Sequence, residues 1–274
     1  MSLRVDCDGI VPAALLSLVP GRFDVIGDIA IVALEDPLLP FSMEIARAII
    51  ARRKSIRMVV RKVTKMDGEH RVARFEILTG SPATTMTVHR EYGFRYRLDI
   101  AKAFFAPRLA SERRRVAGMV RAGERVIVPF AGVGPFVIPA AEKGAVVTAI
   151  EKNPQAFRFL EENVAANGVA SRTTLTRGDA FDRSLLPKGA FDRAIVPAPY
   201  GQDRILDSIV PAVKPDGWIH MYTFRKKHEI EGLIARYAEK GLSAETFRRC
   251  GNIAPGVNRW VFDLRKTGAT DFPG

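Results

Sequence analysis

Short apolar runs alternate with amphipathic segments over the second half of the chain. Each run is rich in β-branched residues and bounded by Gly, Pro or Asp, which is typical of the buried strands of a parallel sheet, whereas the segments between them have the spacing of helices. We predict strands at 126–128, 145–151, 173–176, 192–196 and 218–224, followed by 243–249 and 258–264 as an antiparallel hairpin at the sheet edge. The pattern indicates an α/β fold with a Rossmann-like, seven-stranded sheet.

The first part of the chain has a different pattern and is predicted to be a small α+β domain. Residues 22–34 read as two short strands joined by a turn at Gly27 and Asp28. A helix capped by Ser42 would bury a stripe of apolar residues and turn arginines outwards. The stripe comprises Ile45, Ala46, Ile49 and Ile50, and the outward residues are Arg47, Arg52 and Arg53. Further strands are expected at 58–63, 71–78, 84–89 and 94–98, which gives two domains, 1–98 and 99–274.

The first strand of the second domain leads into a glycine-containing turn, Phe130-Ala-Gly-Val-Gly-Pro-Phe136. Gly132 and Gly134 permit a tight turn, and Pro135 is predicted to start a helix. Glu151 ends the next strand about 20 residues later, where a carboxylate can accept hydrogen bonds from both ribose hydroxyls. A dinucleotide site would have glycine in place of Val137. The turn therefore favours S-adenosylmethionine, which has no phosphate; an ordinary β–α turn is the alternative.

Two more strand ends should meet at the same edge of the sheet. Asp179 would accept from the exocyclic amine of adenine. Pro197-Ala-Pro-Tyr200 would face the acceptor, because it resembles the Asn-Pro-Pro-Tyr loop of enzymes that methylate planar nitrogens. A purely structural turn is the alternative for this loop.

Alkylation of a protonated ring nitrogen also needs a base. Our candidate is Glu112, in the first turn of a helix that Ser111 would cap, with Arg71 or Arg115 beside the developing negative charge. A solvated acid at a helix start is the alternative for Glu112.

The charge of the chain indicates the kind of partner that it binds. The net charge is +12, and the basic residues are gathered in two places. Arg47 to Lys65 contains no acid, and a second cluster comprises Arg108, Arg113, Arg114 and Arg115. Such clusters favour nucleic acid as a partner, although solvated faces would look the same. Cys7 and Cys250 lack metal-ligand spacing, so we expect free thiols, no metal and a cytoplasmic protein. No apolar run reaches the roughly 18 residues needed to cross a membrane, and we expect a monomer.

Three motifs carry a resemblance to a known family: the block 103–115, the turn 130–136, and Gly251-Asn-Ile-Ala-Pro-Gly-Val257. From about Phe23 onwards the chain resembles the archaeal and eukaryotic tRNA guanine-37 N1-methyltransferases and their wybutosine-pathway aminocarboxypropyl transferase relatives. The resemblance implies a class I S-adenosylmethionine-dependent fold, a small RNA-positioning domain at 1–98, and the anticodon region of tRNA as partner. It also implies that Glu112 is the general base and that Arg71 lies close to the target guanine.

The predicted site follows from the strand ends together with the resemblance. The catalytic residues are expected to be Glu112, Arg71, Arg115, Pro197, Pro199 and Tyr200. The cofactor residues are expected to be Phe105, Arg108, Phe130, Ala131, Gly132, Val133, Gly134, Glu151, Lys152, Asn153, Asp179 and Ala180.

Two positions depart from the family pattern: Val128 stands where the family usually has Asp, and Pro197 where its methyltransferases have Asn. The aminocarboxypropyl branch also lacks that Asn, and residues 149–153 look more like that branch, whereas 130–136 and 219–224 look more like the methyltransferases. We therefore predict formation of N1-methylguanine at position 37 of tRNA. Aminocarboxypropyl transfer from the same cofactor is the first alternative, and a non-catalytic tRNA-binding paralogue is the second.

Overall fold

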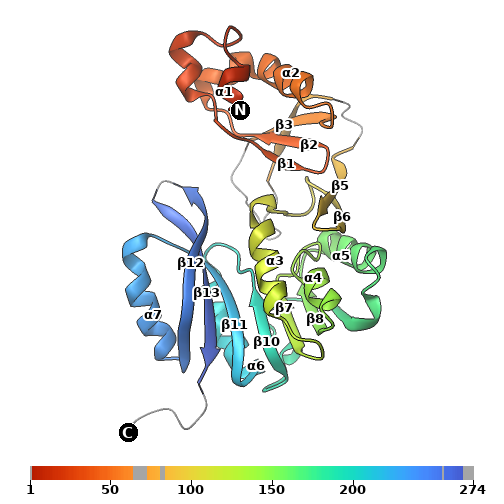
Figure 1. Cartoon of the computed structure of the whole chain (residues 1–274), viewed down its shortest axis with the longest axis vertical. Helices are drawn as coiled ribbons and strands as arrows, with labels where there is room; N and C mark the ends of the chain where they lie inside the picture. Colours follow the sequence, from red (N-terminus) through yellow and green to blue (C-terminus); the bar gives the residue numbers. More distant parts are fainter. Residues whose placement is uncertain (1, 64–72, 81–83, 255, 268–274) are drawn as a thin grey trace. The chain divides into compact units, whose positions relative to one another are not determined.

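The computed structural model describes residues 2–63, 73–80, 84–254 and 256–267 (Figure 1). The chain forms two compact units, Met1–Pro107 and Arg108–Gly274. Of the predicted features, Arg71, Lys65 and the first part of the strand expected at 71–78 lie outside the described residues.

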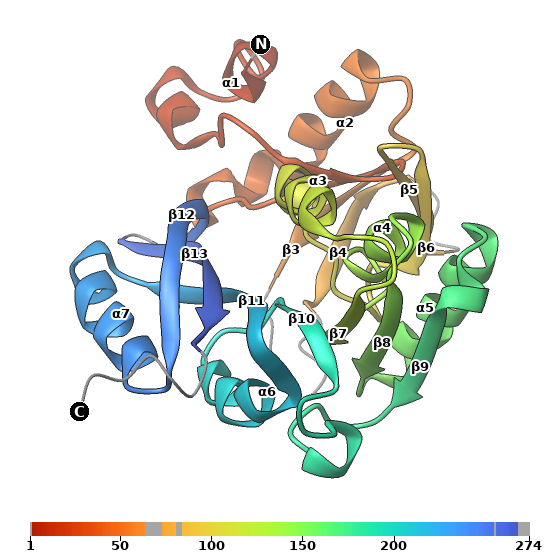
Figure 2. The same ribbon diagram turned by 60° about the horizontal axis from the view of Figure 1, so that its bottom comes forward.

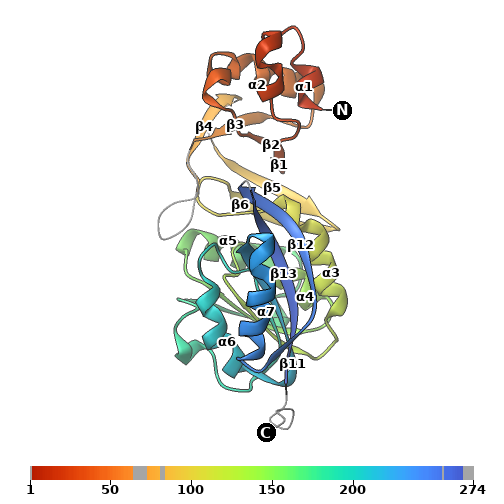
Figure 3. The same cartoon turned by 90° about the vertical axis from the view of Figure 1, so that its left-hand side faces the viewer.

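The first unit contains a four-stranded sheet and a separate hairpin. The sheet has the order β1-β2-β3-β4, with β2 and β3 parallel and the other pairs antiparallel. The strands are β1 (Asp24–Ile26), β2 (Ile29–Val32), β3 (Met58–Lys62), β4 (Phe75–Thr79) and, in the hairpin, β5 (Met86–Glu91) and β6 (Phe94–Asp99). The helices α1 (Leu3–Asp6) and α2 (Ser42–Arg52) lie on the same face of the sheet (Figure 3). The predicted stripe of α2 packs there, since Ile45, Ala46 and Ile49 are buried and Ile50 is partly buried.

The second unit is built on the predicted seven-stranded sheet. The strands are β7 (Arg125–Pro129), β8 (Val146–Glu151), β9 (Thr173–Arg177), β10 (Phe191–Val196), β11 (Val213–Arg225), β12 (Leu242–Ala254) and β13 (Val257–Lys266). Their order in space is β12-β13-β11-β10-β7-β8-β9. Every neighbouring pair is parallel except the two that involve β13, which is antiparallel to both β11 and β12. The predicted C-terminal hairpin at the sheet edge is thus confirmed.

Helices cover both faces of this sheet (Figure 2). They are α3 (Ala110–Met119), α4 (Val137–Glu142), α5 (Pro154–Ala166), α6 (Leu206–Ala212) and α7 (Ile230–Ala238). From β7 the chain steps outwards through β8 and β9, and from β10 it steps the other way to β11. Right-handed crossovers in opposite directions place α4 and α5 on one face and α6 and α7 on the other. The direction of winding changes between β7 and β10, where ligands bind in open α/β sheets.

Three predicted helix starts were wrong. Ser42 and Ser111 do not cap α2 and α3, because a 3₁₀ turn runs directly into each helix and makes Phe41 and Leu109 the preceding residues. Pro135 does not start α4, which begins at Val137 after two more residues of turn.

Both cysteines are free thiols, Cys7 buried and Cys250 half-buried. Burial raises the pKa of the Cys7 thiol and raises that of Cys250 to about 12, so both stay protonated at neutral pH. Among the described residues, no helix has the length and apolar character that a membrane span requires.

Candidate active site

The turn after β7 has an unusual backbone. Phe130, Gly132 and Gly134 all have positive φ, at 54°, 57° and 96°. Glycine adopts this conformation freely, whereas it costs energy for Phe130, and such strain concentrates at functional sites. A Cβ on Gly134 would also lie 2.9 Å from Leu160 Cδ1, so the turn packs tightly against α5. The predicted glycine turn therefore exists, and both glycines are needed for its shape.

Glu151 holds this turn with its carboxylate at the tip of β8. One oxygen accepts from the Gly132 N–H at 2.7 Å, and the other accepts from the Asn153 N–H at 2.7 Å. Asn153 in turn caps α5, because its side chain accepts from the Gln155 N–H at 2.9 Å. A carboxylate oxygen can accept more than one hydrogen bond. Two hydrogen bonds thus fix an acceptor group of the kind that can bind a ribose diol.

The third strand end supplies Asp179. One carboxylate oxygen accepts from the Phe181 N–H at 3.0 Å, and the other pairs with Lys152 Nζ at 3.0 Å. The hydrogen bond from Phe181 and the pairing with Lys152 lower the pKa of Asp179, so it is ionised at neutral pH. The Phe130 and Phe181 rings meet edge to face, with 6.0 Å between centroids. Acceptors and aromatic edges therefore gather beside the glycine turn.

One residue that supports the turn escaped the sequence prediction. Asn163, in the middle of α5, is buried and donates from Nδ2 to the Val133 carbonyl at 3.0 Å. A buried asparagine on an otherwise apolar helix stripe was the available signal, because such groups are almost always hydrogen-bonded.

The fourth strand end is the loop Pro197 to Tyr200. The Ala198 N–H donates to the Val196 carbonyl at 2.8 Å, which closes a tight turn between the two prolines. Tyr200 is 56% exposed, and its ring lies 5.6 Å from that of Phe224 in β11. The Arg259 guanidinium lies 4.9 Å from the centroid of the Phe224 ring. The loop thus presents an aromatic surface that is open to solvent and backed by a cation.

Glu112 is almost completely buried, at 8% exposure, although it lies in the first turn of α3. Arg115 Nε donates to its Oε2 at 2.9 Å, and the Tyr222 hydroxyl lies 3.5 Å from the same oxygen. The Tyr222 ring packs against Phe136 with centroids 5.2 Å apart. Tyr222 therefore connects the candidate base with the end of the glycine turn.

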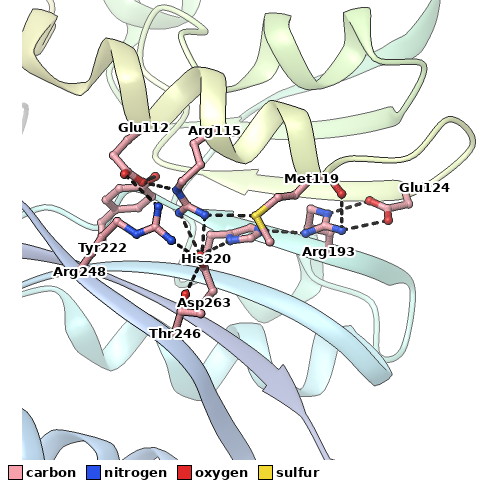
Figure 4. Close-up of polar contacts among 10 residues, drawn as sticks. All are labelled: Glu112, Arg115, Met119, Glu124, Arg193, His220, Tyr222, Thr246, Arg248 and Asp263. Atoms are coloured by element: carbon pink, nitrogen blue, oxygen red, sulfur yellow. Dashed lines mark hydrogen bonds and ion pairs between the residues drawn. The ribbon is translucent and has the colours of Figure 1, made fainter.

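Arg115 belongs to a chain of charged and polar side chains that the sequence did not predict (Figure 4). Its Nη1 and Nη2 donate to the two oxygens of Asp263 in β13 at 2.8 and 3.0 Å. Asp263 also accepts from His220 Nδ1 at 2.6 Å, from the Thr246 hydroxyl at 2.9 Å and from Arg248 Nη2 at 3.5 Å. Behind His220, Arg193 Nη1 lies 2.7 Å from Nε2, and Arg193 also pairs with Glu124 at 2.7 Å.

The geometry fixes the tautomer of His220. Arginine can only donate, so Nε2 must accept from Arg193 and the proton lies on Nδ1, facing Asp263. Complete burial lowers the pKa of His220 and keeps the ring neutral. The hydrogen bonds from His220 and Arg115 outweigh burial at Asp263 and hold the pKa of its carboxyl well below its usual range. The negative charges of Glu112, Glu124 and Asp263 are thus balanced by the positive charges of three arginines around a neutral imidazole. The arginines are Arg115, Arg193 and Arg248.

The remaining predicted residues fall in different places. Phe105 is a buried residue of the first unit, where its ring lies 4.8 Å from that of His89. Arg108 lies in the 3₁₀ turn Pro107–Leu109, and Ala180 is buried after β9. All predicted site residues except Phe105 and Arg71 belong to the second unit. In the described part of the chain, no three His, Cys, Asp or Glu side chains are grouped to hold a metal ion.

The two basic clusters differ in accessibility. In the first, Arg47 and Arg53 are exposed as predicted, but Arg57 binds Asp28 at 2.8 Å and the Met86 carbonyl, which ties the β1–β2 turn to β5. In the second, Arg113 is only 2% exposed and Arg115 is engaged in the network. Part of the charge that suggested a nucleic-acid surface therefore has a structural role.

Comparisons with known proteins match parts of both units. Residues 87–243 match the family model of the TRM5/TYW2 methyltransferase domain, and residues 7–84 match that of the TYW2 N-terminal domain. The tRNA (guanine(37)-N(1))-methyltransferase Trm5b of Pyrococcus abyssi is 44% identical over 159 residues, which cover 58% of this chain and 48% of that protein.

The chain is also similar to an aminocarboxypropyl transferase. The tRNA(Phe) (4-demethylwyosine(37)-C(7)) aminocarboxypropyltransferase of Pyrococcus horikoshii is 40% identical over 163 residues, which cover 59% of this chain and 57% of that protein. A solved structure of TYW2 from Pyrococcus horikoshii in complex with MeSAdo has a TM-score of 0.76 and 30% identity, and the match covers 96% of this chain and 97% of that one. The chain spans about half the length of the two curated relatives.

Proposed function

The chain belongs to the TRM5/TYW2 methyltransferase family, and on this basis we propose that it is an S-adenosylmethionine-dependent tRNA methyltransferase that forms N1-methylguanine at position 37. The observation that carries the proposal is the placement of Glu112 against Tyr222, whose ring packs on the end of the glycine turn. A buried carboxylate and a nucleoside-binding turn are thereby joined within one unit.

The strand tips of the second unit fit the cofactor. Glu151 would accept from the ribose hydroxyls, because two backbone N–H groups hold its carboxylate at the tip of β8 and a carboxylate oxygen can accept more than one hydrogen bond. Asp179 would accept from the adenine amine, with Ala180, Lys152 and Asn153 around it. The strained backbone from Phe130 to Gly134 would bring main-chain groups close to the methionine part. When bound, S-adenosylmethionine supplies an electrophilic methyl group on sulfur.

The chain itself would prepare the acceptor. Glu112 would take the N1 proton of guanine, and Arg71 would stabilise the negative charge that develops on the ring oxygen. Arg115 already makes four hydrogen bonds to Glu112, Met119 and Asp263, so we assign it to the support of Glu112 rather than to the guanine. Pro197, Pro199 and the exposed ring of Tyr200 would hold the flipped base by stacking.

Partners and assembly are part of the same proposal. We assign the anticodon region of tRNA as the substrate, which is supported by the exposed arginines of α2 and by the names of both relatives. We expect the active form to be a monomer, which light scattering on the purified protein would check.

Two labels test the reaction. The protein is incubated with S-adenosylmethionine labelled on the methyl or on the carboxyl group, and with a tRNA transcript that has guanosine at position 37. The matched control transcript carries adenosine there. Methyl label should enter the first transcript only. Entry of neither label, despite calorimetric binding of S-adenosylhomocysteine, would identify a non-catalytic paralogue.

Aminocarboxypropyl transfer is the second candidate, and two observations favour it. Residues 149–153 resemble that branch, and Pro197 stands where the methyltransferases have asparagine. The relative from Pyrococcus horikoshii, at 40% identity, catalyses this reaction by its name. The same labels distinguish the two reactions. Transfer of the carboxyl label to a tRNA that already carries 4-demethylwyosine at position 37 would contradict methyl transfer.

A further inference from the structure

Two arginines, Arg115 and Arg248, bridge the carboxylate of the candidate base Glu112 and that of Asp263. Arg115 binds Asp263 through both terminal nitrogens and Glu112 through Nε alone. Arg248 lies at a longer distance from both acids, 3.8 Å from Glu112 Oε1 and 3.5 Å from Asp263 Oδ2. The flat, two-pronged face of the Arg115 guanidinium, which makes the stronger kind of carboxylate pair, is therefore directed at Asp263 rather than at Glu112.

The same arrangement leaves the two oxygens of Glu112 different. Oε2 accepts hydrogen bonds from Arg115 Nε at 2.9 Å and from the Tyr222 hydroxyl at 3.5 Å. Among the described residues, Oε1 has the Arg248 guanidinium at 3.8 Å, which exceeds hydrogen-bond distance. A bidentate pair with Arg115 would occupy both oxygens of Glu112 and would make it a poor proton acceptor. Arg115 makes its two-pronged contact with Asp263 and binds Glu112 through Nε alone.

We infer that Asp263 and His220 are positioning residues for the base. His220 orients the Asp263 carboxylate, and Asp263 in turn holds Arg115. Glu112 thereby stays ionised but keeps one oxygen able to accept a proton. This inference rests on the proposed function, in which Glu112 is the base. His220 can orient Asp263 because Arg193 and Glu124 fix the ring from the opposite side, in β10 and before β7.

Among the described residues, charged and titratable groups from several elements lie around Glu112 or its direct partners. They are Arg115 on α3, Tyr222 and His220 on β11, Arg248 and Cys250 on β12, and Asp263 on β13. Burial and the nearby Glu112 charge raise the pKa of Tyr222 well above its usual value, and Cys250 and His220 are neutral. Near neutral pH, Asp263 is therefore the negative charge whose removal would change the field at Glu112 most.

The main test is the variant Asp263→Asn, which keeps the shape and removes the charge. Two guanidinium groups then face Glu112 alone, so the carboxylate is harder to protonate and a weaker base. In single-turnover reactions with methyl-labelled cofactor and the guanosine-37 transcript, we expect a plateau rate about tenfold lower. The pH at which the rate falls to half on the acidic side should drop by about one unit. The matched control is Asp216→Asn, at an exposed aspartate of β11 that pairs with Arg265 at 3.3 Å.

A merely structural role would lower the plateau without moving the acidic side of the profile, and that result would overturn the inference. Should Asp263→Asn fail to fold, as judged by S-adenosylhomocysteine binding, two His220 variants replace it. Asparagine places a donor where Nδ1 is and keeps the bond to Asp263, whereas glutamine places its amide where Nε2 is and loses that bond. We expect His220→Gln to lower the plateau about tenfold and His220→Asn to leave it within about threefold; equal rates would contradict the inference.

The wild-type protein separates this inference from the proposed function. If it transfers no label, or if Glu112→Gln leaves the pH profile unchanged, the assignment of the base is wrong. If wild type shows an acidic limb that depends on Glu112 but neither Asp263 nor His220 variants alter the reaction, only the positioning role is wrong.

Discussion

The glycine turn and the Glu112 network, which we assign to one site, are built in opposite ways. The turn is held by backbone N–H groups and by Glu151, and its partners lie within about 30 residues of one another. The network is held by side chains from α3, β10, β11 and β13, and Arg115 and Asp263 are 148 residues apart. A nucleoside-binding turn can therefore be encoded by a local motif, whereas a buried balance of charge requires the completed sheet.

The largest expected effect is on the rate of transfer, when Glu112 in the network is replaced. Glu112→Gln should reduce transfer by about 10²–10⁴-fold, because the amide cannot take a proton in the transition state. Its affinity for S-adenosylhomocysteine, measured by calorimetry, should stay within a few-fold of wild type, since the cofactor contacts belong to the turn. Glu142→Gln, at an exposed glutamate of α4, is the matched control. Unchanged turnover would remove Glu112 as the base.

The complementary change affects the turn. In Glu151→Gln the new amide group must face the N–H of either Gly132 or Asn153, so at least one hydrogen bond to a charged group is lost, at about 1.5–3 kcal/mol. We expect calorimetry to show affinity for S-adenosylhomocysteine about 10- to 100-fold weaker, again with Glu142→Gln as control. If cofactor binding were intact while catalysis was lost, the roles assigned to the two regions would have to be reversed.

A smaller effect concerns acid stability. The unfolded chain protonates His220 near pH 6.5, but the folded protein keeps it neutral because burial lowers its pKa. The unfolded state therefore binds more protons, and the free energy of unfolding should fall as the pH drops below about 6.5, by at most about 1.4 kcal/mol per pH unit. Asp263 does not contribute in this window, because its lowered pKa keeps it ionised there.

Urea unfolding at pH 7.5, 6.5 and 5.5 measures this slope. Trp218 and Trp260 are the two tryptophans and both lie in the second unit, so their fluorescence reports on that unit alone. The slope should be shallower in His220→Asn. An equal slope in the variant would show that other groups cause the pH dependence.

The smallest expected effect tests the basic surface of α2. Arg47, whose side chain is 68% exposed, and Arg53 both lie at the surface, whereas Arg57 is not a suitable target because it ties the β1–β2 turn to β5. Arg47→Glu with Arg53→Glu should weaken tRNA binding and reduce the slope of log affinity against log salt by roughly 1–2. Arg158→Glu, at an equally exposed arginine of α5, is the control. Identical slopes in both variants would exclude this face as a contact.

The sequence predicted the sheet and the glycine turn for physical reasons that can be traced to single residues. Apolar β-branched runs fixed the strands, and Gly132, Gly134 and Glu151 revealed the turn because its geometry requires those residue types at those spacings. Burial of charge could not be predicted in this way. Arg113 and Arg115 look like surface residues in the sequence, and nothing local links them to Asp263 or His220. Helix starts were missed where 3₁₀ turns replaced side-chain caps.

The buried pairing of Arg193 with Glu124 and His220 has a consequence for how this protein would respond to laboratory evolution. Apolar side chains of similar volume often pack such a space at no loss, or even with a gain, in folding free energy. Variants selected only for heat resistance should therefore tend to replace this chain of polar groups with aliphatic residues. Selection for turnover should retain it, so the two selections should diverge first at these internal positions.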